Sequence, residues 1–341
     1  MALSAQPERG GVRLALDFAG RFRGVLAFVL VFALGVIFSP KSLSSGQSVF
    51  LNWTTQNDIL FEYAEYGILA AGMTLVIITA GIDLSVGSVL GFAATFFSLL
   101  VIGHGWPAPA AVVVTVLATS AMGAASGLVI SRFRIQPFVA TLGMMLVARG
   151  AAKYISGGVK VQPGGQSWYS VQSGTPEVFD WMTSPTALLG LKPITLAFLL
   201  SIAVLWVALR FTRFGRYLYA IGGNEEAARL SGIRVGLAKT AAYALSGVTA
   251  GLAGVCNSSR MTLGDPEAGF TYELDAIAAV VIGGTSLMGG KGGMFFTFLG
   301  TLIIAYISKI LSLRGTEEAS RLMIRGGLII IAVLIQQIRK E

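Results

Sequence analysis

Two carboxylates stand inside or beside long apolar runs of this chain, where an acid is costly and therefore informative. Asp83 lies in 81–87 (GIDLSVG), between two apolar runs, and Ser85 follows it closely. Glu273 opens another apolar run that ends in the Gly-rich stretch 283–292. A carboxylate at the centre of a membrane helix costs about 2.5–3.5 kcal/mol on insertion scales. Such acids should therefore face a partner or a water-filled passage, where they could contact a solute, a proton or a cation.

The stretch around Asp83 has two interpretations. In the first, two membrane helices are broken by a polar elbow near a transport path, since irregular backbone at membrane depth is tolerated only inside protein or along a pore. In the second, residues 81–87 are a short cytoplasmic turn, and Asp83 simply caps the next helix. We favour the elbow because charge within a membrane is rare.

The composition is that of a polytopic membrane protein. The chain has 341 residues, of which 54% are hydrophobic and 12% are charged, and its mean hydropathy is +0.74. Soluble domains carry about 25% charged residues. The net charge of +8 does not indicate nucleic-acid binding, because the basic residues fall at the ends of apolar runs, where they set topology.

The chain lacks the residues for several common chemistries. It has one cysteine, Cys256, and one histidine, His104, which excludes an intrachain disulfide and a zinc site built from these types. The stretch 283–292 is no phosphate loop, because Thr285 replaces its first glycine and Gly292 replaces its Ser or Thr. We expect no cofactor in this chain and find no catalytic acid, base and nucleophile.

The hydropathy pattern predicts an all-α fold with about ten transmembrane helices and broken or re-entrant elements, since a span needs about 20 apolar residues. A single transmembrane domain would cover 24–338, after a cytoplasmic segment 1–23. Residues 156–192 would form a periplasmic insertion. An acid and a Gly-bounded break occur in both halves, which favours an internal repeat. The predicted spans are 24–40, 65–81, 87–104, 109–130, 136–154, 193–210, 238–257, 273–289, 293–312 and 321–338.

Basic residues are in excess on one set of loops, which predicts that both termini are cytoplasmic. The largest loop on that side is 211–237. It contains a predicted short helix, 224–233, with Asn224 as N-cap and Gly232 as the C-terminal stop. So short a helix normally needs a docking surface, so it is either a folded connector or a knob that fits a partner protein.

Three stretches together resemble a known family: 72–89 (GMTLVIITAGIDLSVGSV), 213–235 (RFGRYLYAIGGNEEAARLSGIRV) and 269–292 (GFTYELDAIAAVVIGGTSLMGGKG). The fragment 135–150, which begins IQPFVATLGMM, adds to the set. They resemble the permease subunits of bacterial ABC importers for monosaccharides, the ribose permease type most closely. The likeness covers most of the chain and is poor at both ends and in 156–192.

The resemblance implies the ABC importer permease fold in the bacterial inner membrane, paired as a homodimer or with a close relative. A cytoplasmic ABC ATPase would bind ATP and magnesium, and a periplasmic sugar-binding protein would deliver a ribose-like pentose, hexose or polyol. The permease itself would be no enzyme and would pass the sugar inward by alternating access. It would couple to the ATPase through Asn224, Glu225, Glu226, Ala227, Arg229, Leu230, Gly232 and Ile233.

For the transport path we predict residues able to hydrogen-bond a sugar or stack on it: Asp83, Ser85, Gln136, Phe138, Thr141 and Glu273. The main alternative is an ion-coupled secondary transporter in which Asp83 or Glu273 carries a proton or cation. A membrane scaffold or receptor is disfavoured, because polar breaks in two helices are expensive for anchoring alone. Among ABC permeases, nucleoside, polyol, autoinducer and branched-chain amino acid cargoes stay open.

Overall fold

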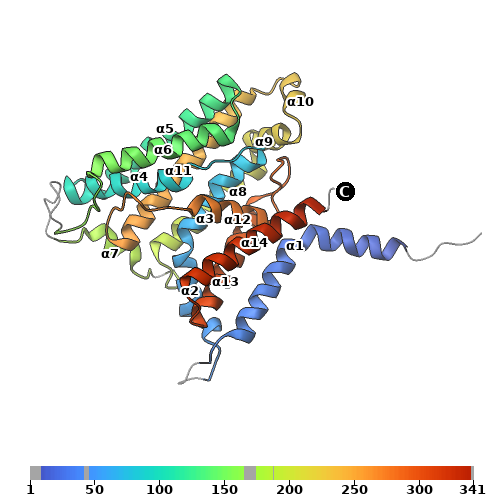
Figure 1. Cartoon of the computed structure of the whole chain (residues 1–341), viewed down its shortest axis with the longest axis horizontal. Helices are drawn as coiled ribbons and strands as arrows, with labels where there is room; N and C mark the ends of the chain where they lie inside the picture. The colour runs from blue at the N-terminus through green and yellow to red at the C-terminus, as the bar shows by residue number, and fades with distance from the viewer. Residues whose placement is uncertain (1–8, 42–45, 165–173, 187, 339–341) are drawn as a thin grey trace, which may run out of the picture.

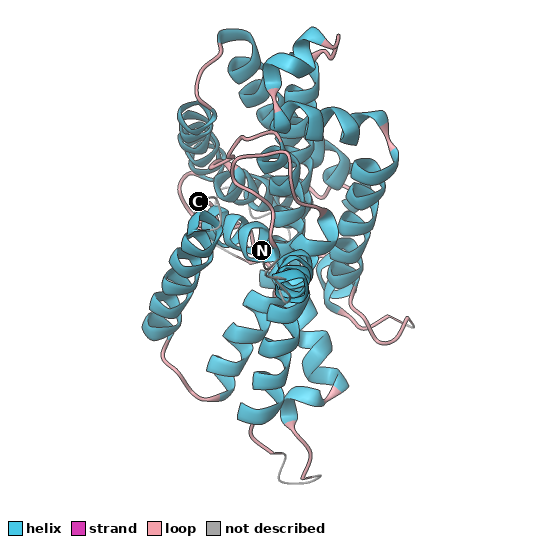
Figure 2. Ribbon diagram, turned by 90° about the vertical axis from the view of Figure 1, so that its right-hand side faces the viewer, coloured by secondary structure: helices cyan, strands magenta, loops and turns pink. Residues whose placement is uncertain are grey.

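The computed structural model describes residues 9–41, 46–164, 174–186 and 188–338 (Figure 1). Within these ranges every regular element is a helix, and pairing of extended backbone is limited to two isolated bridges. The predicted all-α fold is therefore confirmed for the described chain, as Figure 2 shows. Part of the predicted segment 1–23 (1–8) and part of the predicted insertion 156–192 (165–173 and 187) lie outside the described residues.

The described chain is a succession of helices. In chain order they are α1 (Arg9–Phe38), η1 (Val49–Leu51), α2 (Trp53–Glu62), α3 (Ala64–Ile78), α4 (Val86–Ser98), η2 (Leu99–Gly103), α5 (Ala108–Phe133), α6 (Pro137–Ser156), α7 (Glu177–Thr183), α8 (Pro193–Phe211), α9 (Arg213–Gly223), α10 (Glu225–Leu230), α11 (Val235–Met261), α12 (Tyr272–Gly283), α13 (Met294–Leu313) and α14 (Glu318–Ile338).

Helix α11 is central and packs against α3, α4 and α5. Small residues permit the close approach of α5 and α11: a side chain at Gly123 would collide with the carbonyl of Tyr243, and one at Gly247 with the carbonyl of Thr119. Gly123 pairs with Gly127, and Gly247 with Gly251, at the GxxxG spacing. This spacing lets membrane helices pack backbone to backbone. The result is a core in which α3, α4 and α5 surround α11, while α5 and α6 are the more exposed of the spans.

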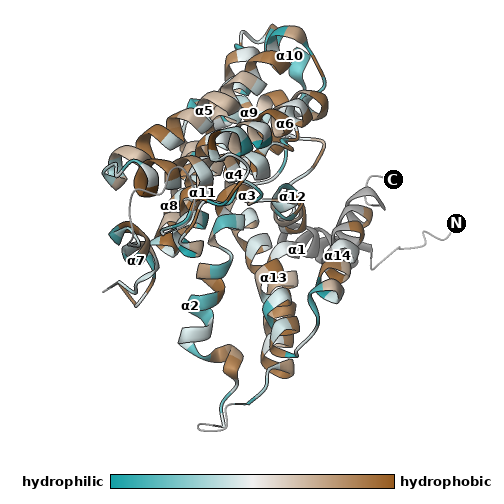
Figure 3. Cartoon of the chain, turned by 60° about the vertical axis from the view of Figure 1, so that its left-hand side comes forward, coloured by the Kyte–Doolittle hydropathy of each residue, from teal (hydrophilic) through white to brown (hydrophobic). Residues whose placement is uncertain are grey.

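Five described helical segments are long and apolar enough to cross a membrane: Val86–Gly103, Ala108–Phe133, Pro137–Ser156, Pro193–Phe211 and Met294–Leu313. A sixth arises if α2 and α3, which meet at a 52° bend, count as one broken span. The membrane class is thereby supported, while the count of ten spans and the internal repeat stay predictions. In Figure 3, α13 is largely brown, or hydrophobic, in the lower part of the view, whereas α10 carries teal, hydrophilic residues at the top, far from α13.

The predicted span 273–289 is wrong. Helix α12 has 12 residues, a length of about 18 Å at 1.5 Å per residue, whereas a bilayer core is about 30 Å thick. Gly284 ends the helix in the left-handed region, at φ 113°, and the chain continues as an irregular loop to Gly293. The expected break at 283–292 thus lies inside what the hydropathy pattern counted as a helix.

The other predicted boundaries differ less. Helix α1 begins well before the predicted span 24–40, at Arg9, and α3 ends at Ile78 rather than at 81. Helix α11 extends beyond 238–257 at both ends. In Figure 1, α9 and α10 lie at one end of the molecule, far from α2 and α7.

Candidate functional site

The loop 79–85 between α3 and α4 is held in place by a buried carboxylate. The side chain of Asp83 is only 1% exposed. Its Oδ1 accepts hydrogen bonds from the backbone N–H and the hydroxyl of Ser85, at 3.0 and 2.6 Å, and its Oδ2 accepts one from the hydroxyl of Ser246 at 2.8 Å. Both oxygens are therefore paired with donors inside the protein, as a buried carboxylate requires.

This geometry agrees with part of the first interpretation of 81–87, because the segment is a polar break enclosed by protein; its place near a transport path stays a prediction. The interpretation of Asp83 as the cap of the next helix is wrong. The N-cap of α4 is Ser85, without a side-chain capping bond, and Asp83 instead accepts from the N–H of Ser85 in the turn before the helix. Asp83 and Ser85, both 1% exposed, do not face an open passage in this conformation. Ser246, on α11, completes the cluster.

Thr141 joins α6 to the same loop. Its hydroxyl accepts from the backbone N–H of Leu84 at 3.2 Å and donates to the carbonyl of Pro137 at 2.9 Å. The neighbouring predicted path residues differ, because Gln136 is exposed and the Phe138 ring is 52% exposed. The structure thus brings Asp83, Ser85 and Thr141 together, and leaves Gln136 and Phe138 on an outer surface of the subunit.

Glu273, the other acid, lies against the first turn of α4 at Gly87. It is half-buried in the first turn of α12, and a side chain at Gly87 would collide with its Oε2 and with the carbonyl of Gly269. Gly87 is therefore needed for the approach of α12. Arg149 of α6 fixes the preceding loop by donating to the carbonyls of Pro266 and Ala268, at 2.6 and 2.8 Å.

The irregular segment 284–293, which follows α12, packs against the end of α3, where the loop 79–85 begins. The backbone N–H of Gly290 donates to the carbonyl of Ile78, the last residue of α3, at 2.9 Å. Helix α9 covers the junction: the Tyr219 hydroxyl donates to the carbonyl of Gly292 at 2.9 Å. A side chain at Gly222 would collide with both Ile78 and Gly290. The two helix breaks and α9 therefore pack together at Gly222, where there is no room for a side-chain methyl group.

Helix α10 follows α9 directly and has the capping predicted from the sequence. The Asn224 side chain accepts from the backbone N–H of Ala227 at 2.9 Å. Gly232 follows the helix with φ 82°, a conformation that glycine adopts without strain. The helix is six residues long, shorter than the predicted 224–233. Its Ala228 is buried, whereas Leu230 is 82% exposed.

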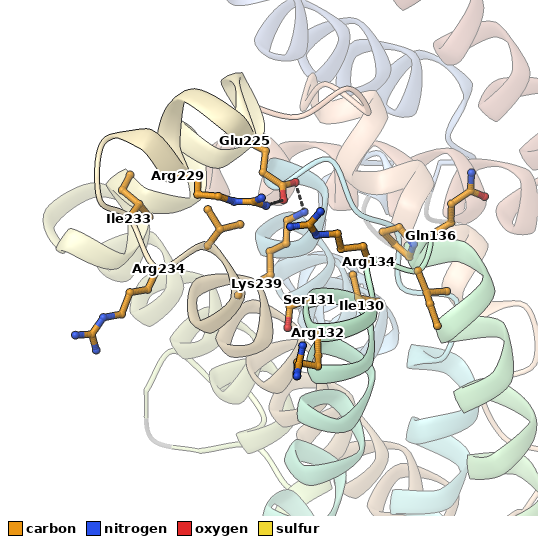
Figure 4. Close-up of a pocket in the computed structure, with 14 residues that line it drawn as sticks. Ile130, Ser131, Arg132, Arg134, Gln136, Glu225, Arg229, Ile233, Arg234 and Lys239 are labelled. Carbon is orange, nitrogen blue, oxygen red and sulfur yellow. Dashed lines mark hydrogen bonds and ion pairs between the residues drawn. The ribbon is translucent and has the colours of Figure 1, made fainter.

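An ion pair ties α10 to the start of α11. Glu225 Oε2 lies 2.5 Å from Lys239 Nζ, and Oε1 lies 3.1 Å from Arg229 Nη2 (Figure 4). Burial opposes ionisation of Glu225, but the hydrogen bonds and charges of Lys239 and Arg229 outweigh it and hold its pKa below the ordinary value. Glu226, in contrast, is exposed.

Polar side chains on one face of α11 continue this connection along the helix. Ser246 comes seven residues after Lys239, and Asn257 comes eleven after Ser246, so all three share a face. At the far end Arg260 Nε donates to Glu65 Oε1 at 2.7 Å, and Asn257 Nδ2 donates to Oε2 at 2.8 Å. Helix α11 thus connects α10, the Asp83 loop and the buried Glu65 of α3.

Comparison with known proteins identifies the chain. A family model described as branched-chain amino acid transport system / permease component matches residues 57–333. The chain belongs to this permease family. It is 37% identical over 313 residues to the ribose import permease protein RbsC of Escherichia coli strain K12, covering 92% of each chain. It is 36% identical to RbsC of Bacillus subtilis, covering 94% of this chain and 95% of that one.

A third relative is the xylose transport system permease protein XylH of Escherichia coli strain K12, 32% identical, with 97% of this chain and 98% of that one covered. No solved structure matches the chain. The resemblance to ABC monosaccharide permeases is confirmed by these relatives. The permease is accordingly a multi-pass protein of the inner membrane that serves transport.

Several residues that organise the permease were not predicted from the sequence. Glu65 opens a predicted span and could have been noticed as an acid in apolar sequence, as Asp83 was. Ser246 and Asn257 could have been found as a polar stripe on the span 238–257. Helix α9 was missed although Thr212 is a good N-cap, and its side chain does accept from the N–H of Gly215.

Proposed function

We propose that this permease is the transmembrane subunit of an ATP-driven ABC importer for a monosaccharide, with a ribose-like pentose as the first candidate and hexoses or related polyols next. The observation that carries the proposal is the 37% identity to a ribose import permease over 92% of the chain. The relatives named for ribose and for xylose both transport pentoses by name, which favours a five-carbon sugar.

The working assembly would contain two permease subunits, a cytoplasmic ABC ATPase and a periplasmic sugar-binding protein. ATP and magnesium would bind the ATPase. Both termini and α10 would lie in the cytoplasm, with the loop between α6 and α8 in the periplasm. The basic residues beside α10 support this orientation, because cytoplasmic loops carry the excess of Lys and Arg.

Helix α10 would be the contact with the ATPase. Glu226, Arg229 and Leu230 are exposed on it and would face the ATPase groove. The remaining predicted coupling residues shape the helix: Asn224 caps it, Ala227 and Gly232 complete its ends, Glu225 ties it to α11, and Ile233 is half-buried behind it.

Movement of α10 would reach the membrane core by two connections. The first is α9, whose Tyr219 and Gly222 pack on the junction of the two helix breaks. The second is the Glu225–Lys239 ion pair, which leads into α11 and so to Ser246. ATP-driven closure of the partner would shift the equilibrium between inward-open and outward-open packings, because these contacts would differ between the two states.

The path would run along the interface between the two subunits. Gln136 and Phe138 are exposed at the start of α6 and would offer a hydrogen-bonding group and an aromatic face to the sugar. Thr141, Asp83 and Ser85 would hold the wall behind them in place. Glu273 would position α12 against α4. Sugar affinity would reside mainly in the binding protein.

The geometry weighs against the ion-coupled alternative. A carboxylate that carries a proton or cation must reach water, but Asp83 is 1% exposed, and both of its oxygens accept from hydroxyl groups. Glu273 is half-buried and stays the better candidate for that mechanism.

The substrate is tested by purifying the permease with its ATPase and binding protein and measuring ATP hydrolysis across pentoses, hexoses and polyols. We expect ribose or a related pentose to stimulate hydrolysis through the loaded binding protein. Stimulation by a branched-chain amino acid, with none by any sugar, would overturn the assignment.

A further inference from the structure

We propose that the permease has a phosphate-binding site between α10 and the turn that joins α5 to α6. The site is a hollow of about 810 Å³, which we call the basic pocket (Figure 4). Small-molecule sites in proteins measure about 300–1,000 Å³. It is lined by the end of α5, the start of α6, α10 and the start of α11.

The charges around the basic pocket are unbalanced. Its lining includes Arg132, Arg134, Arg229, Arg234 and Lys239, whereas Glu225 is the one carboxylate among the lining residues, so the lining carries five positive charges against one negative, a formal +4. The guanidinium is suited to phosphate because its donors match two phosphate oxygens at once. An anion with two negative charges would offset half of this excess.

The position of Arg134 concentrates this excess charge in the hollow. Its guanidinium lies near the Glu225–Lys239 ion pair (Figure 4), whereas Glu225 itself pairs with Lys239 and Arg229. Arg134 is in no ion pair with a described residue. It stands at the end of α5 in the left-handed region, at φ 54°, which costs a non-glycine residue energy.

Neutral donors complete the site. The Ser131 hydroxyl lies 3.2 Å from the hydroxyl of Thr240, and Ser131 and Gln136 line the hollow. Hydroxyl and amide groups suit the ester side of a phosphate. The ligand is therefore a phosphate ester, either a soluble one of sugar size or the headgroup of an anionic phospholipid at the inner membrane surface. The cytoplasmic position of the pocket and its effect on coupling rest on the proposed function, whereas phosphate binding itself does not.

Occupation of the basic pocket has a consequence for coupling. A phosphate between Arg134 and Lys239 competes with the Glu225 carboxylate for Lys239, and the Glu225–Lys239 ion pair is what ties α10 to α11. A bound phosphate therefore loosens α10 from α11. The site links the level of a phosphorylated compound, or the charge of the membrane, to the transfer of ATPase movement.

The test uses a reporter cysteine, which this chain permits because its own Cys256 is buried. Gly236 lines the pocket, and a side chain there would meet Ser131 at an ordinary contact distance of 3.6 Å. Gly223 is the control, since it is outside the pocket lining and has no atom within 4 Å of an added side chain. The rate at which an uncharged maleimide modifies Gly236→Cys or Gly223→Cys is measured on the purified permease in phosphatidylcholine nanodiscs.

Two arms distinguish the sources of phosphate. In one, inorganic phosphate or glycerol 3-phosphate is added, with sodium chloride at equal ionic strength as the comparison. In the other, phosphatidylglycerol replaces part of the phosphatidylcholine. A ligand that blocks the pocket slows modification by 1 + [L]/Kd, or about tenfold at nine times Kd. We expect slowing at Gly236→Cys in at least one arm and none at Gly223→Cys.

Arg134→Gln should abolish most of the slowing, whereas Arg213→Gln, an equal loss of charge at an exposed position outside the pocket lining, should keep it. Equal slowing by sodium chloride, or slowing in neither arm, would overturn the proposal. Neither the ATPase nor sugar is used in the two arms, so their outcome is independent of the transport assignment.

Discussion

The backbone N–H of Gly290 donates a 2.9 Å hydrogen bond to the carbonyl of Ile78, and this bond joins the two helix breaks of the permease. Helix α9 packs on the same junction through Gly222. Since α9 continues directly into α10, the proposed ATPase contact and the two breaks belong to one connected unit.

Gly222 provides the first test of this connection. In Gly222→Val the new side chain would overlap Ile78 and Gly290, and overpacking of this kind costs about 1–3 kcal/mol. We expect sugar-stimulated ATP hydrolysis to fall severalfold in the purified assembly. Gly223→Val is the matched control, because nothing lies within 4 Å of an added side chain there. Equal effects of the two variants would show that the junction has no special role.

The contact of α10 with the ATPase is tested at Leu230, which is 82% exposed. Leu230→Arg should lower sugar-stimulated ATP hydrolysis and leave the turnover of the isolated ATPase unchanged, because the fold of the permease does not need this side chain. Wild-type stimulation in Leu230→Arg would refute the role of α10. Exposed Leu237 offers a comparison position on α11.

The Ser246–Asp83 hydrogen bond should contribute to stability. A hydrogen bond to a charged group contributes about 1.5–3 kcal/mol, so Ser246→Ala should lower the thermal unfolding midpoint of the detergent-solubilised permease. Ser201→Ala is the control, because that hydroxyl donates only to Ala197 of its own helix at 2.7 Å. An unchanged midpoint in Ser246→Ala would mean that the loop 79–85 is held by other contacts.

The buried pair of Glu65 and Arg260 should show strong energetic coupling. Removing one partner leaves the other charge buried, which costs about 3–5 kcal/mol, whereas replacing both partners can be nearly neutral. We expect Arg260→Met alone to destabilise the permease markedly, and the double variant Glu65→Gln/Arg260→Met to recover much of the loss. A double variant that is less stable than the sum of the single variants predicts would contradict this.

The attachment of α10 to α11 should depend on pH in a defined range. The pKa of Glu225 is lowered in the folded protein, so its stabilising contribution is present above the unfolded value of about 4.3. That contribution is lost as the pH falls through the lower, folded value. A spin label at Leu230→Cys should stay ordered at pH 5 and become more mobile only below about pH 4. In the added variant Glu225→Gln the label should be mobile throughout, whereas Glu226→Gln should behave as the parent.

Local features of this fold could be predicted from the sequence, and long-range ones could not. The capping of α10 by Asn224 and its end near Gly232 depend on residues a few positions apart. The sequence predicted one span over 273–289, because the apolar composition of this stretch does not reveal that the backbone of Gly284 is in the left-handed region and ends α12 there. The partner of Asp83, Ser246, is 163 positions away, so only the packing of α11 identifies it.

The candidate site shows the same division. Hydropathy correctly indicated that Asp83 needs partners, but the presence of Ser85 beside it does not say whether the pair faces a passage or the protein interior. Asp83 is enclosed because α11 approaches closely, and that approach depends on glycines such as Gly72, which lies against Ser246 and Thr249. The exposure of Phe138 follows from the position of α6 at the edge of the subunit.

The most direct test of the central claim is uptake of radiolabelled ribose into sealed vesicles that contain the permease with or without its ATPase. The account predicts accumulation only when the ATPase, the binding protein and ATP are all present, and no effect of collapsing the ion gradient. Accumulation by the permease alone, driven by a proton or sodium gradient, would contradict it.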